Sequence, residues 1–490
     1  MNIKANYQRW LQEDSLPLSL REELLAMNDK QINDAFFKDI EFGTAGMRGL
    51  LGAGPAKMNI YTVRKATIAF AKYLLKTYED AAKRGVVIAH DNRFMSREFT
   101  LDTAKTLNNM GINAYIFDSL RPTPQLSYAV RYLKCVGGVM ITASHNPKEY
   151  NGYKIYDENG SQLVPTKLAP MLNILARMEL AIDVKLVEAK KLGVTHTLSK
   201  TIDEAYLHSV LGIQLRKELD KKDFKIVFSP EHGAASMLGI ELFSRLNYDF
   251  VPVESQLEPD PTFSHTKTPN PEEDGAYEEA IKLAISEDAD IILVTDPDAD
   301  RLGLAYKNKD GAYARFTGNE SGALLLDYIL SFRKDRGLLK KNSAIYTTIV
   351  TSEFGNKIAK SYGVDVKLFL TGFKYIGNQV ELDNQSKQSH FEFGYEESYG
   401  LLVDPFVRDK DALQAMVLYS EMANFYKKNG LTLDQAYQKL MEKHGYFYDI
   451  SHSIMFPGAE GAKNMEKMLT NLRREPLESI SEFKVITRED

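Results

Sequence analysis

Three aspartates in one short segment have the residue type and spacing of a metal site. Asp296, Asp298 and Asp300 alternate within residues 295–301 (TDPDADR). Side chains at i, i+2 and i+4 point to one side when the backbone is nearly extended. Carboxylates are hard oxygen ligands, and no sulfur or imidazole accompanies them, so the pattern favours Mg²⁺ or Ca²⁺ over zinc. The alternative is an acidic turn in solvent, although three carboxylates this close repel one another unless a positive group joins them.

This aspartate segment does not have the pattern of an EF-hand. An EF-hand loop needs glycine at its sixth position and glutamate at its twelfth. Counted from Asp296, those positions hold Arg301 and Lys307, and an apolar strand-like run precedes the segment.

A serine follows a second apolar run. Ser144, in residues 142–147 (TASHNP), comes directly after residues 136–141, whose length and branched side chains indicate a buried strand. Ligands of open α/β sheets bind beyond such strand ends, so the Ser144 hydroxyl is a candidate carrier of a phosphoryl group. Asn151-Gly152 predicts a tight turn into another strand, and this hairpin would return Lys154 towards Ser144. The alternative is that Ser144 only caps a turn and that Lys154 is a solvated strand residue.

A charge count indicates why these segments would meet. The three aspartates carry −3, and one Mg²⁺ together with Arg301 would bring the group to zero. A phosphate on Ser144 would add about −1.5 to −2. Lys154 and Arg48, the latter in the glycine-rich segment 42–49, are the residues that would balance this charge and steady the oxygens of a phosphoryl group in transfer.

The composition excludes several classes of partner. The 490 residues are 44% hydrophobic and 26% charged, as in ordinary soluble globular proteins. The net charge of −6 leaves no general basic surface, so we expect neither nucleic acid nor membrane as a partner. The single cysteine, Cys135, excludes a disulfide framework and fits a reducing compartment. No apolar run approaches the roughly 18 residues of a membrane span and no signal-peptide pattern opens the chain, so we expect a cytoplasmic protein.

The order of strands and helices predicts the fold class. Short apolar strands alternate with helical patterns three times, which indicates an α/β protein with three consecutive three-layer α/β domains and mixed sheets. We expect domain I at residues 1–195 with the Ser144 loop, domain II at 196–312 with the aspartate loop, and domain III at 313–445. In each domain a polar motif follows a strand end.

Other local patterns predict further elements and contacts. A capping box at residues 19–22 predicts the start of a helix. Apolar spacing predicts helices at 60–78 and 272–286. Residues 91–93 (DNR) follow a short buried strand and are a candidate polar contact between domains.

Taken together, the motifs resemble a known family. TASHNP with YNGYK (residues 150–154), then DPDADR, then GYEESYG (residues 394–400) occur in the order found in the α-D-phosphohexomutase family, the phosphoglucomutase/phosphomannomutase family. The resemblance is closest to its phosphoglucomutase branch and covers residues 43 to about 428. It implies conversion of glucose 1-phosphate to glucose 6-phosphate and back, through a phosphoserine and a bound glucose 1,6-bisphosphate.

The resemblance also implies a role for each matching residue. Ser144 would carry the phosphoryl group and join Asp296, Asp298 and Asp300 as a ligand of Mg²⁺. The catalytic set would be Ser144, Lys154 as general acid and base, His145 and Arg48. The implied substrate-binding residues are Arg301, Thr371, Glu396, Ser398 and Lys410. Glu396 can accept hydrogen bonds from two sugar hydroxyls and Ser398 can donate or accept, which suits a polyol that binds in two orientations. The implied partners are small-molecule sugar phosphates, and the chain would be a monomer or weak homodimer.

The C-terminal part departs from the family pattern. The family has a fourth domain whose Arg-x-Ser-Gly-Thr-Glu-Pro loop holds the phosphate that is not transferred, and this motif does not occur in the sequence. We expect residues 446–490 to be the truncated start of this C-terminal phosphate-binding domain. Charge-assisted hydrogen bonds contribute about 1.5 to 3 kcal/mol each, so we expect the chain to bind metal but to turn over poorly.

The same motifs leave other activities open. A phosphopentomutase or a glucose-1,6-bisphosphate synthase would share them. A non-catalytic sugar-phosphate-binding protein would also fit if the phosphate-holding loop is naturally absent.

Overall fold

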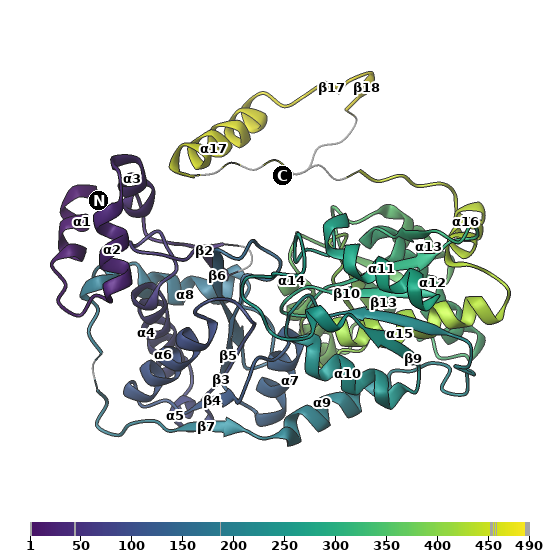
Figure 1. Ribbon diagram of the computed structural model, residues 1–490, viewed down its shortest axis with the longest axis horizontal. Helices are drawn as coiled ribbons and strands as arrows, with labels where there is room; N and C mark the ends of the chain where they lie inside the picture. Colours follow the sequence, from purple (N-terminus) through teal and green to yellow (C-terminus); the bar gives the residue numbers. More distant parts are fainter. Residues whose placement is uncertain are drawn as a thin grey trace. The chain divides into compact units, whose positions relative to one another are not determined.

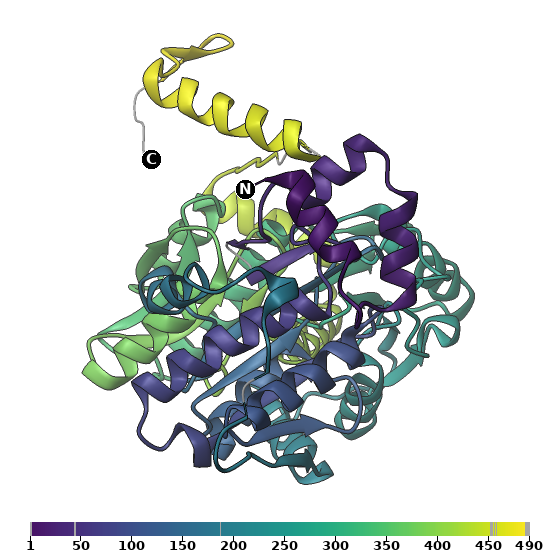
Figure 2. The ribbon, with the colours of Figure 1, turned by 90° about the vertical axis from the view of Figure 1, so that its left-hand side faces the viewer.

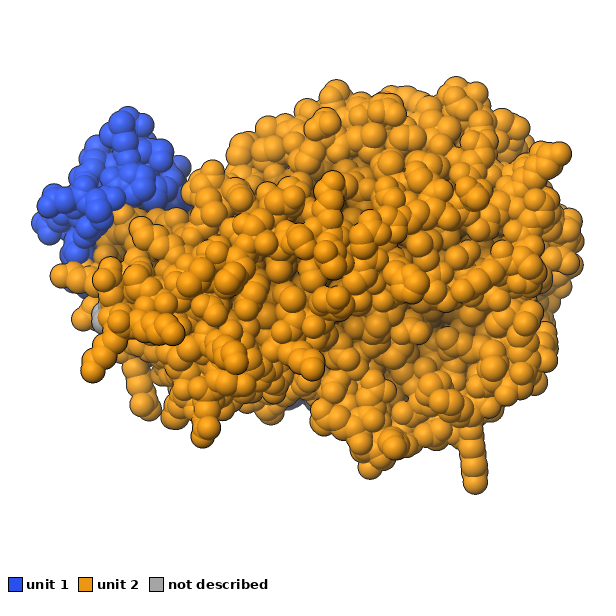
Figure 3. All heavy atoms as spheres, turned by 90° about the horizontal axis from the view of Figure 1, so that it is seen from below, with its two compact units in different colours: residues 1–39, 52–57, 449–490 blue, residues 40–51, 58–448 orange. Residues whose placement is uncertain are grey.

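The computed structural model describes residues 2–43, 46–186, 188–450, 454, 456 and 458–485 (Figure 1). The chain forms two compact units, which are coloured separately in Figure 3. One comprises residues 1–39, 52–57 and 449–490, and the other comprises residues 40–51 and 58–448. None of the helices in the described ranges combines the length and the hydropathy that a membrane crossing requires.

The first unit is mainly helical. Its helices are α1 (Ile3–Leu11), α2 (Leu18–Ala26), α3 (Asp29–Phe36) and α17 (Gly458–Arg474), and its strands β17 (Ser479–Ile480) and β18 (Phe483–Lys484) form a hairpin. Trp10 and Phe36 are buried and meet edge to face with ring centroids 6.0 Å apart. The predicted capping box at Ser19 is wrong, because α2 begins after Pro17 and has no side-chain cap. The proposal that residues 446–490 start a fourth domain stays a prediction.

The second unit begins with a seven-stranded mixed sheet. Its strands run in the order β1-β2-β6-β5-β3-β4-β7. The strands are β1 (Phe42–Gly43), β2 (Gly46–Leu50), β3 (Val86–His90), β4 (Ala114–Phe117), β5 (Gly137–Ile141), β6 (Tyr150–Asp157) and β7 (Thr195–Leu198). The helices are α4 (Ile60–Thr77), α5 (Ala81–Arg84), α6 (Ser96–Asn109), α7 (Thr123–Leu133), α8 (Pro165–Leu175) and the 3-10 turn η1 (Ala181–Asp183).

Helices cover both faces of this sheet. Helices α4 and α6 lie against one face of the sheet (Figure 2). There Phe70 of α4 and Phe99 of α6 pack in one core with Val86 and Ile88. On the opposite face, Leu126 of α7 packs with residues such as Val87, Ala89 and Met140. The alternation of side chains along buried strands sends them to the two cores, which gives the predicted three layers.

The hairpin that carries Lys154 differs from its prediction in one respect. β5 and β6 are antiparallel, with Met140 opposite Lys154, as the predicted hairpin requires. Asn151 and Gly152 lie within β6 and pair with β2, so the predicted tight turn at these residues is wrong. A Cβ at Gly152 would collide with the carbonyl oxygen of Thr142, so glycine serves close backbone approach here instead of a turn.

The second sheet carries the aspartate loop. Its order is β12-β11-β10-β8-β9. The elements are α9 (Lys200–Gly212), β8 (Lys225–Ser229), α10 (Ala235–Leu246), β9 (Asp249–Pro252), η2 (Glu254–Gln256), η3 (Asp274–Tyr277), α11 (Glu278–Glu287), β10 (Ile291–Thr295), β11 (Leu302–Lys307) and β12 (Tyr313–Arg315). The predicted helix at 272–286 starts later than expected, because residues 274–277 form a 3-10 turn and Glu272 lies in a loop.

The third sheet has the order β14-β13-β15-β16. Its elements are α12 (Gly318–Asp335), β13 (Ser343–Thr348), α13 (Glu353–Ser361), β14 (Asp365–Phe369), α14 (Phe373–Ser386), β15 (His390–Tyr395), β16 (Leu401–Leu402), α15 (Ala412–Lys428) and α16 (Leu433–His444). One continuous apolar core joins the second and third sheets through α15, which packs against both.

Two of the expected domain limits fall inside sheets. β7 belongs to the first sheet and continues to Leu198, past the expected limit at residue 195. β12 pairs with β11 in the second sheet, although residue 313 was expected to open domain III. In addition, residues 1–39 cluster outside the unit that holds the first sheet. β7 pairs with β4, about 80 residues earlier, whereas β12 pairs with β11, the strand that precedes it in the chain. The domain limits stay a prediction.

Candidate active site

Loops from the first two sheets meet at the Ser144 hydroxyl. The loop after β5 carries Ser144, and the loop between β10 and β11 carries Asp296. Ser144 Oγ donates a hydrogen bond to Asp296 Oδ2 at 2.6 Å, across 152 residues of sequence. Both side chains are buried. The structure therefore brings together the serine and the carboxylates that the charge count placed at one site.

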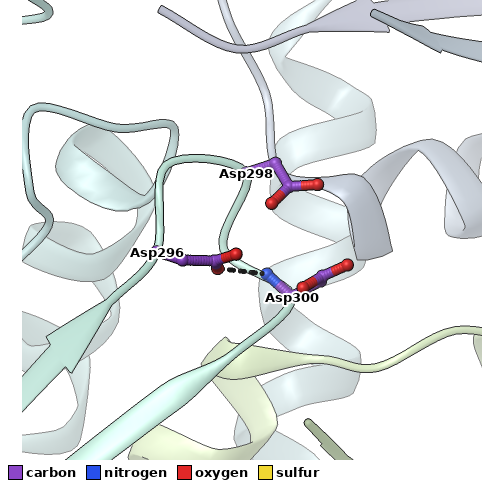
Figure 4. A group of neighbouring side chains, drawn as sticks. All are labelled: Asp296, Asp298 and Asp300. Atoms are coloured by element: carbon purple, nitrogen blue, oxygen red, sulfur yellow. Dashed lines mark hydrogen bonds between the residues drawn. The ribbon is translucent and has the colours of Figure 1, made fainter. Parts of the chain in front are cut away.

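The three aspartates form one compact group. Each offers one carboxylate oxygen, and these oxygens lie within 4.8 Å of one another. Asp296 Oδ1 turns back to accept hydrogen bonds from the backbone N–H groups of Asp300 and Arg301 at 3.1 and 3.0 Å. Figure 4 shows the first of these bonds and the three carboxylates gathered around one loop. The bonds fix the loop so that its side chains converge.

The aspartate group fits a hard divalent cation. In the described part of the chain, Oδ1 of Asp298 and Oδ1 of Asp300 are buried and make no hydrogen bond. Buried carboxylate oxygens without a donor are costly unless a cation joins them. The donor set is entirely oxygen, which suits Mg²⁺ or Ca²⁺. Asp296, Asp298 and Asp300 are thus the residues that could hold the ion.

Protonation of the aspartates depends on the same crowding. Burial, followed by the charges of Asp298 and Asp300, raises the pKa of Asp296 well above its usual value. Burial also acts to raise the pKa of Asp298, but Lys154 and hydrogen bonds outweigh it and lower that pKa. When no cation is bound, the pKa of Asp296 is therefore raised while the pKa of the neighbouring Asp298 is lowered.

Ser144 has an unusual backbone conformation. Its φ of 51° lies in the left-handed region, which is unfavourable for residues other than glycine and asparagine. Its N–H donates to Thr142 Oγ1 at 2.8 Å. His145 Nδ1 lies 3.2 Å from Ser144 Oγ. Burial, then the nearby Arg301 and Arg48, lower the pKa of His145 well below its usual value, so the ring is neutral at pH 7.

Lys154 lies between two of the aspartates. Its Nζ is 2.8 Å from Asp298 Oδ2 and 3.4 Å from Asp300 Oδ2. Burial acts to lower the pKa of Lys154, but the two carboxylates outweigh it and raise that pKa. The Lys154 ammonium therefore stays protonated at pH 7.

Three further cations surround the group. Lys410 Nζ lies 3.1 Å from Asp300 Oδ2. Arg48 donates from Nη1 to Asn146 Oδ1 at 2.6 Å, so it reaches the Ser144 loop from β2. Residues 44 and 45 of its glycine-rich segment lie outside the described residues. Arg301 donates to Glu272 Oε1 at 2.5 Å. The site thus has positive charge on several sides of the aspartates.

Three of the residues expected to bind substrate, Thr371, Glu396 and Ser398, lie on loops of the third sheet. Glu396 is buried at the end of β15, and its Oε1 accepts a hydrogen bond from Gly372 N at 3.0 Å. Burial raises the pKa of Glu396. Thr371 is exposed and Ser398 half-buried, and within the described ranges no hydrogen bond joins either side chain to the Ser144 or aspartate loops. The structure therefore leaves these two apart from the central group.

Three residues near the site have no assigned role in the sequence analysis. Thr123 Oγ1 donates to Asp298 Oδ2 at 2.8 Å, and Glu272 pairs with Arg301. Arg93 donates to carbonyls of the Ser144 loop. The only sequence signal was for residues 91–93: Asn92 Nδ2 donates to Asp260 O at 2.8 Å, which confirms the predicted polar contact between the first two domains.

Three consecutive segments match the descriptions of one protein family. Residues 39–180 match "Phosphoglucomutase/phosphomannomutase, alpha/beta/alpha domain I", and residues 204–311 and 317–444 match domains II and III of the same description. The Ser144 loop, the aspartate loop and the Glu396 loop each fall in one of these segments.

Individual proteins are similar over nearly the whole chain. A phosphoglucomutase of Staphylococcus haemolyticus is 36% identical over 100% of this chain and 87% of its own length. A phosphoglucomutase of Staphylococcus epidermidis is 38% identical over 92% of this chain and 81% of its own. The crystal structure of a phosphoglucomutase/phosphomannomutase family protein from Burkholderia thailandensis matches with a TM-score of 0.63 and 19% identity. The match covers 78% of this chain and 76% of that protein. That last likeness shows the fold.

Proposed function

Because the chain belongs to the phosphoglucomutase/phosphomannomutase family of isomerases, we propose that it interconverts glucose 1-phosphate and glucose 6-phosphate. The phosphoryl group passes through Ser144 and through glucose 1,6-bisphosphate. The observation that carries this proposal is the 2.6 Å hydrogen bond from Ser144 Oγ to Asp296 Oδ2. This hydrogen bond places the Ser144 hydroxyl directly beside the aspartates that could hold a cation.

The metal in this proposal is Mg²⁺, held by Asp296, Asp298 and Asp300 together with an oxygen on Ser144. When bound, Mg²⁺ supplies positive charge that offsets the charge on the transferred phosphoryl group. Arg48 and Arg301 add to that charge from two other elements. Such fixed charges stabilise the transition state without reorganisation at the moment of transfer.

The transfer step balances in atoms and protons. When Ser144 takes a phosphoryl group from the bisphosphate, a bond from Oγ to phosphorus forms and the bond from phosphorus to a sugar oxygen breaks. One proton leaves the Ser144 hydroxyl for Asp296 Oδ2, which accepts its hydrogen bond, and one reaches the departing sugar oxygen. Lys154, which the two aspartates keep protonated, gives the latter proton, and in the reverse direction its amine takes the proton of the attacking sugar hydroxyl.

Substrate binding in this proposal uses the third sheet. Glu396 accepts hydrogen bonds from sugar hydroxyls, and Thr371 and Ser398 line the same loops. Lys410, already near Asp300, reaches the substrate from the segment before α15. A sugar that must bind in two orientations needs acceptors and donors at similar places for each, which these residue types offer.

A coupled assay tests the proposal. The chain is given glucose 1-phosphate, Mg²⁺ and a trace of glucose 1,6-bisphosphate, and glucose 6-phosphate is measured. Intact-mass analysis and peptide mapping follow phosphate on Ser144. Ser144→Ala should abolish both the formation of glucose 6-phosphate and the phosphate on residue 144. Ser119→Ala, at a half-buried serine of the same domain, should preserve both. Greater activity on ribose 1-phosphate would favour a pentomutase, and no turnover with no phosphate on Ser144 would overturn the proposal.

A further inference from the structure

A buried arginine holds the loop that carries Ser144. Arg93 lies just after β3, and its guanidinium donates to the carbonyls of Ser144 at 2.5 Å, Pro147 at 2.8 Å and Tyr150 at 3.1 Å. It also donates to the carbonyl of Asn146. One side chain thus binds both ends of the turn between β5 and β6.

The bound loop needs such support. Ser144 has a φ of 51°, which an L-residue adopts only when its surroundings hold it there. The carbonyl of Ser144 is itself one of the acceptors of Arg93. The arginine therefore acts on the residue whose hydroxyl must point at Asp296. Charge-assisted donors in a buried site are strong and directional, which suits this task.

Arg93 is itself oriented by a buried acid. Its Nε lies 3.3 Å from Asp91 Oδ2, and both side chains are fully buried. Asp91 Oδ1 accepts hydrogen bonds from Arg93 N at 3.0 Å and Ser96 Oγ at 2.8 Å. Ser96 Oγ accepts a further bond from Asn151 Nδ2 at 3.0 Å, which leads back to β6. Hydrogen bonds therefore connect Arg93 to the hairpin a second time, through Asp91, Ser96 and Asn151.

The same arginine also contacts the second domain. Its guanidinium lies 5.4 Å from the ring centroid of Phe263, and the adjacent Asn92 donates to Asp260 O. The Ser144 loop and the domain that carries the aspartates therefore share one support. A shift of Arg93 would change the distance between Ser144 Oγ and the aspartate loop.

We propose that Arg93 is a positioning residue for phosphoryl transfer: it holds Ser144 in the left-handed conformation in which Oγ faces both the aspartate loop and the substrate. This inference rests on the proposed function. Arg93 binds main-chain carbonyls in the described structure, so its effect passes through Ser144. A displacement of about 1 Å at a reacting group costs on the order of 100-fold in rate.

The test compares Arg93→Lys with Arg97→Lys in the full chain with Mg²⁺. Arg97 is a matched control because it also donates to a carbonyl, that of Phe117, but away from the Ser144 loop. A lysine at 93 keeps the charge but cannot reach four carbonyls. We expect kcat and the rate of Ser144 phosphorylation to fall about 100-fold with KM changed by less than about threefold. The rise of Tm caused by Mg²⁺ should persist, and Arg97→Lys should match the wild type.

A second set of variants separates a positioning effect from a loss of folding. Arg93→Ala should regain part of its kcat when millimolar methylguanidinium is added, and Arg97→Ala should not respond. If Arg93→Lys does not fold, Asp91→Asn replaces it, with an expected loss of about tenfold in kcat because the arginine keeps its donors but loses its counter-ion.

Each outcome has one meaning. A folded Arg93→Lys with wild-type kcat, or an Asp91→Asn with wild-type kcat, overturns the positioning role and leaves the proposed function intact. Joint loss of activity and of the Mg²⁺ response also overturns it, because the arginine would then only support folding. A wild-type chain without mutase activity and without phosphate on Ser144 overturns the proposed function, and the inference falls with it.

Discussion

The ammonium of Lys154 lies 2.8 Å from Oδ2 of Asp298, and this contact joins a strand of the first sheet to a loop of the second. The two residues are 144 positions apart in the sequence. The contact places a protonated amine inside the group of carboxylates that fits a divalent cation. The proposed function therefore places proton transfer and charge compensation at the same point of the molecule.

Removing this amine should separate the two roles. Lys154→Met is expected to lower kcat about 100- to 10,000-fold, because a positioned acid or base contributes that range. Mg²⁺ should bind more tightly, since a competing positive charge has left Asp298 and Asp300. Coupled assays and magnesium titration measure the two effects, and Lys148→Met, on the exposed part of the Ser144 loop, serves as the control. Weaker Mg²⁺ binding in Lys154→Met would contradict this account.

Mg²⁺ should stabilise the folded chain through the aspartates. A ligand that binds only the native state adds about 2.7 kcal/mol at 100 times its Kd, so Mg²⁺ should raise Tm. Asp300→Asn should lose most of this rise because one of the three aspartate ligands is gone. Asp310→Asn, at an exposed turn, should keep it. Differential scanning calorimetry with and without EDTA measures the shift, and an equal rise in both variants would count against the aspartate site.

Glu231 should make stability fall as the pH rises. This side chain is fully buried after β8, and burial raises its pKa from the usual 4.5 to about 8. The folded state therefore holds a proton that the unfolded state releases, so stability is full below pH 4.5 and declines as the pH rises towards 8. The slope is at most about 1.4 kcal/mol per pH unit.

Glu231→Gln should remove this decline. Urea unfolding at pH 5 and pH 8 should show similar stability for the variant at both, while the wild type weakens at pH 8. Glu254→Gln, at an exposed position, should behave as the wild type. If the free energy of unfolding fell equally with pH in Glu231→Gln and the wild type, the Glu231 carboxyl would not be the cause of the decline.

Glu272 should compete with substrate for Arg301. Its carboxylate accepts a hydrogen bond from Arg301 Nη1 at 2.5 Å, and its side chain is 38% exposed. The Arg301 side chain is 16% exposed, so the pair is only partly solvated and contributes on the order of 1 kcal/mol. Glu272→Gln should therefore lower the KM for glucose 1-phosphate about fivefold. The adjacent Glu273 bonds to Asn270 instead, so Glu273→Gln is a matched control. A raised KM in Glu272→Gln would indicate that Glu272 orients Arg301 instead of competing for it.

The sequence by itself determined the local elements and the chemistry that they carry. Apolar runs predicted β5 and β10, and helical spacing predicted α4. A buried strand needs apolar residues along its whole length, and an amphipathic helix needs them at helical intervals. The aspartate triplet indicated a hard cation because its donors are neighbours along the chain. A family resemblance added the order of the motifs, which the matches to residues 39–180, 204–311 and 317–444 confirm.

Only the tertiary structure decided which distant groups meet. Thr123 bonds to Asp298, Glu272 pairs with Arg301, and Arg93 binds the Ser144 loop, all across long stretches of sequence. Asn151-Gly152 reads locally as a turn, yet pairing with β2 places it inside a strand. Such contacts depend on sheet order and domain packing, and no periodic or local pattern in the chain encodes the partner of a given side chain.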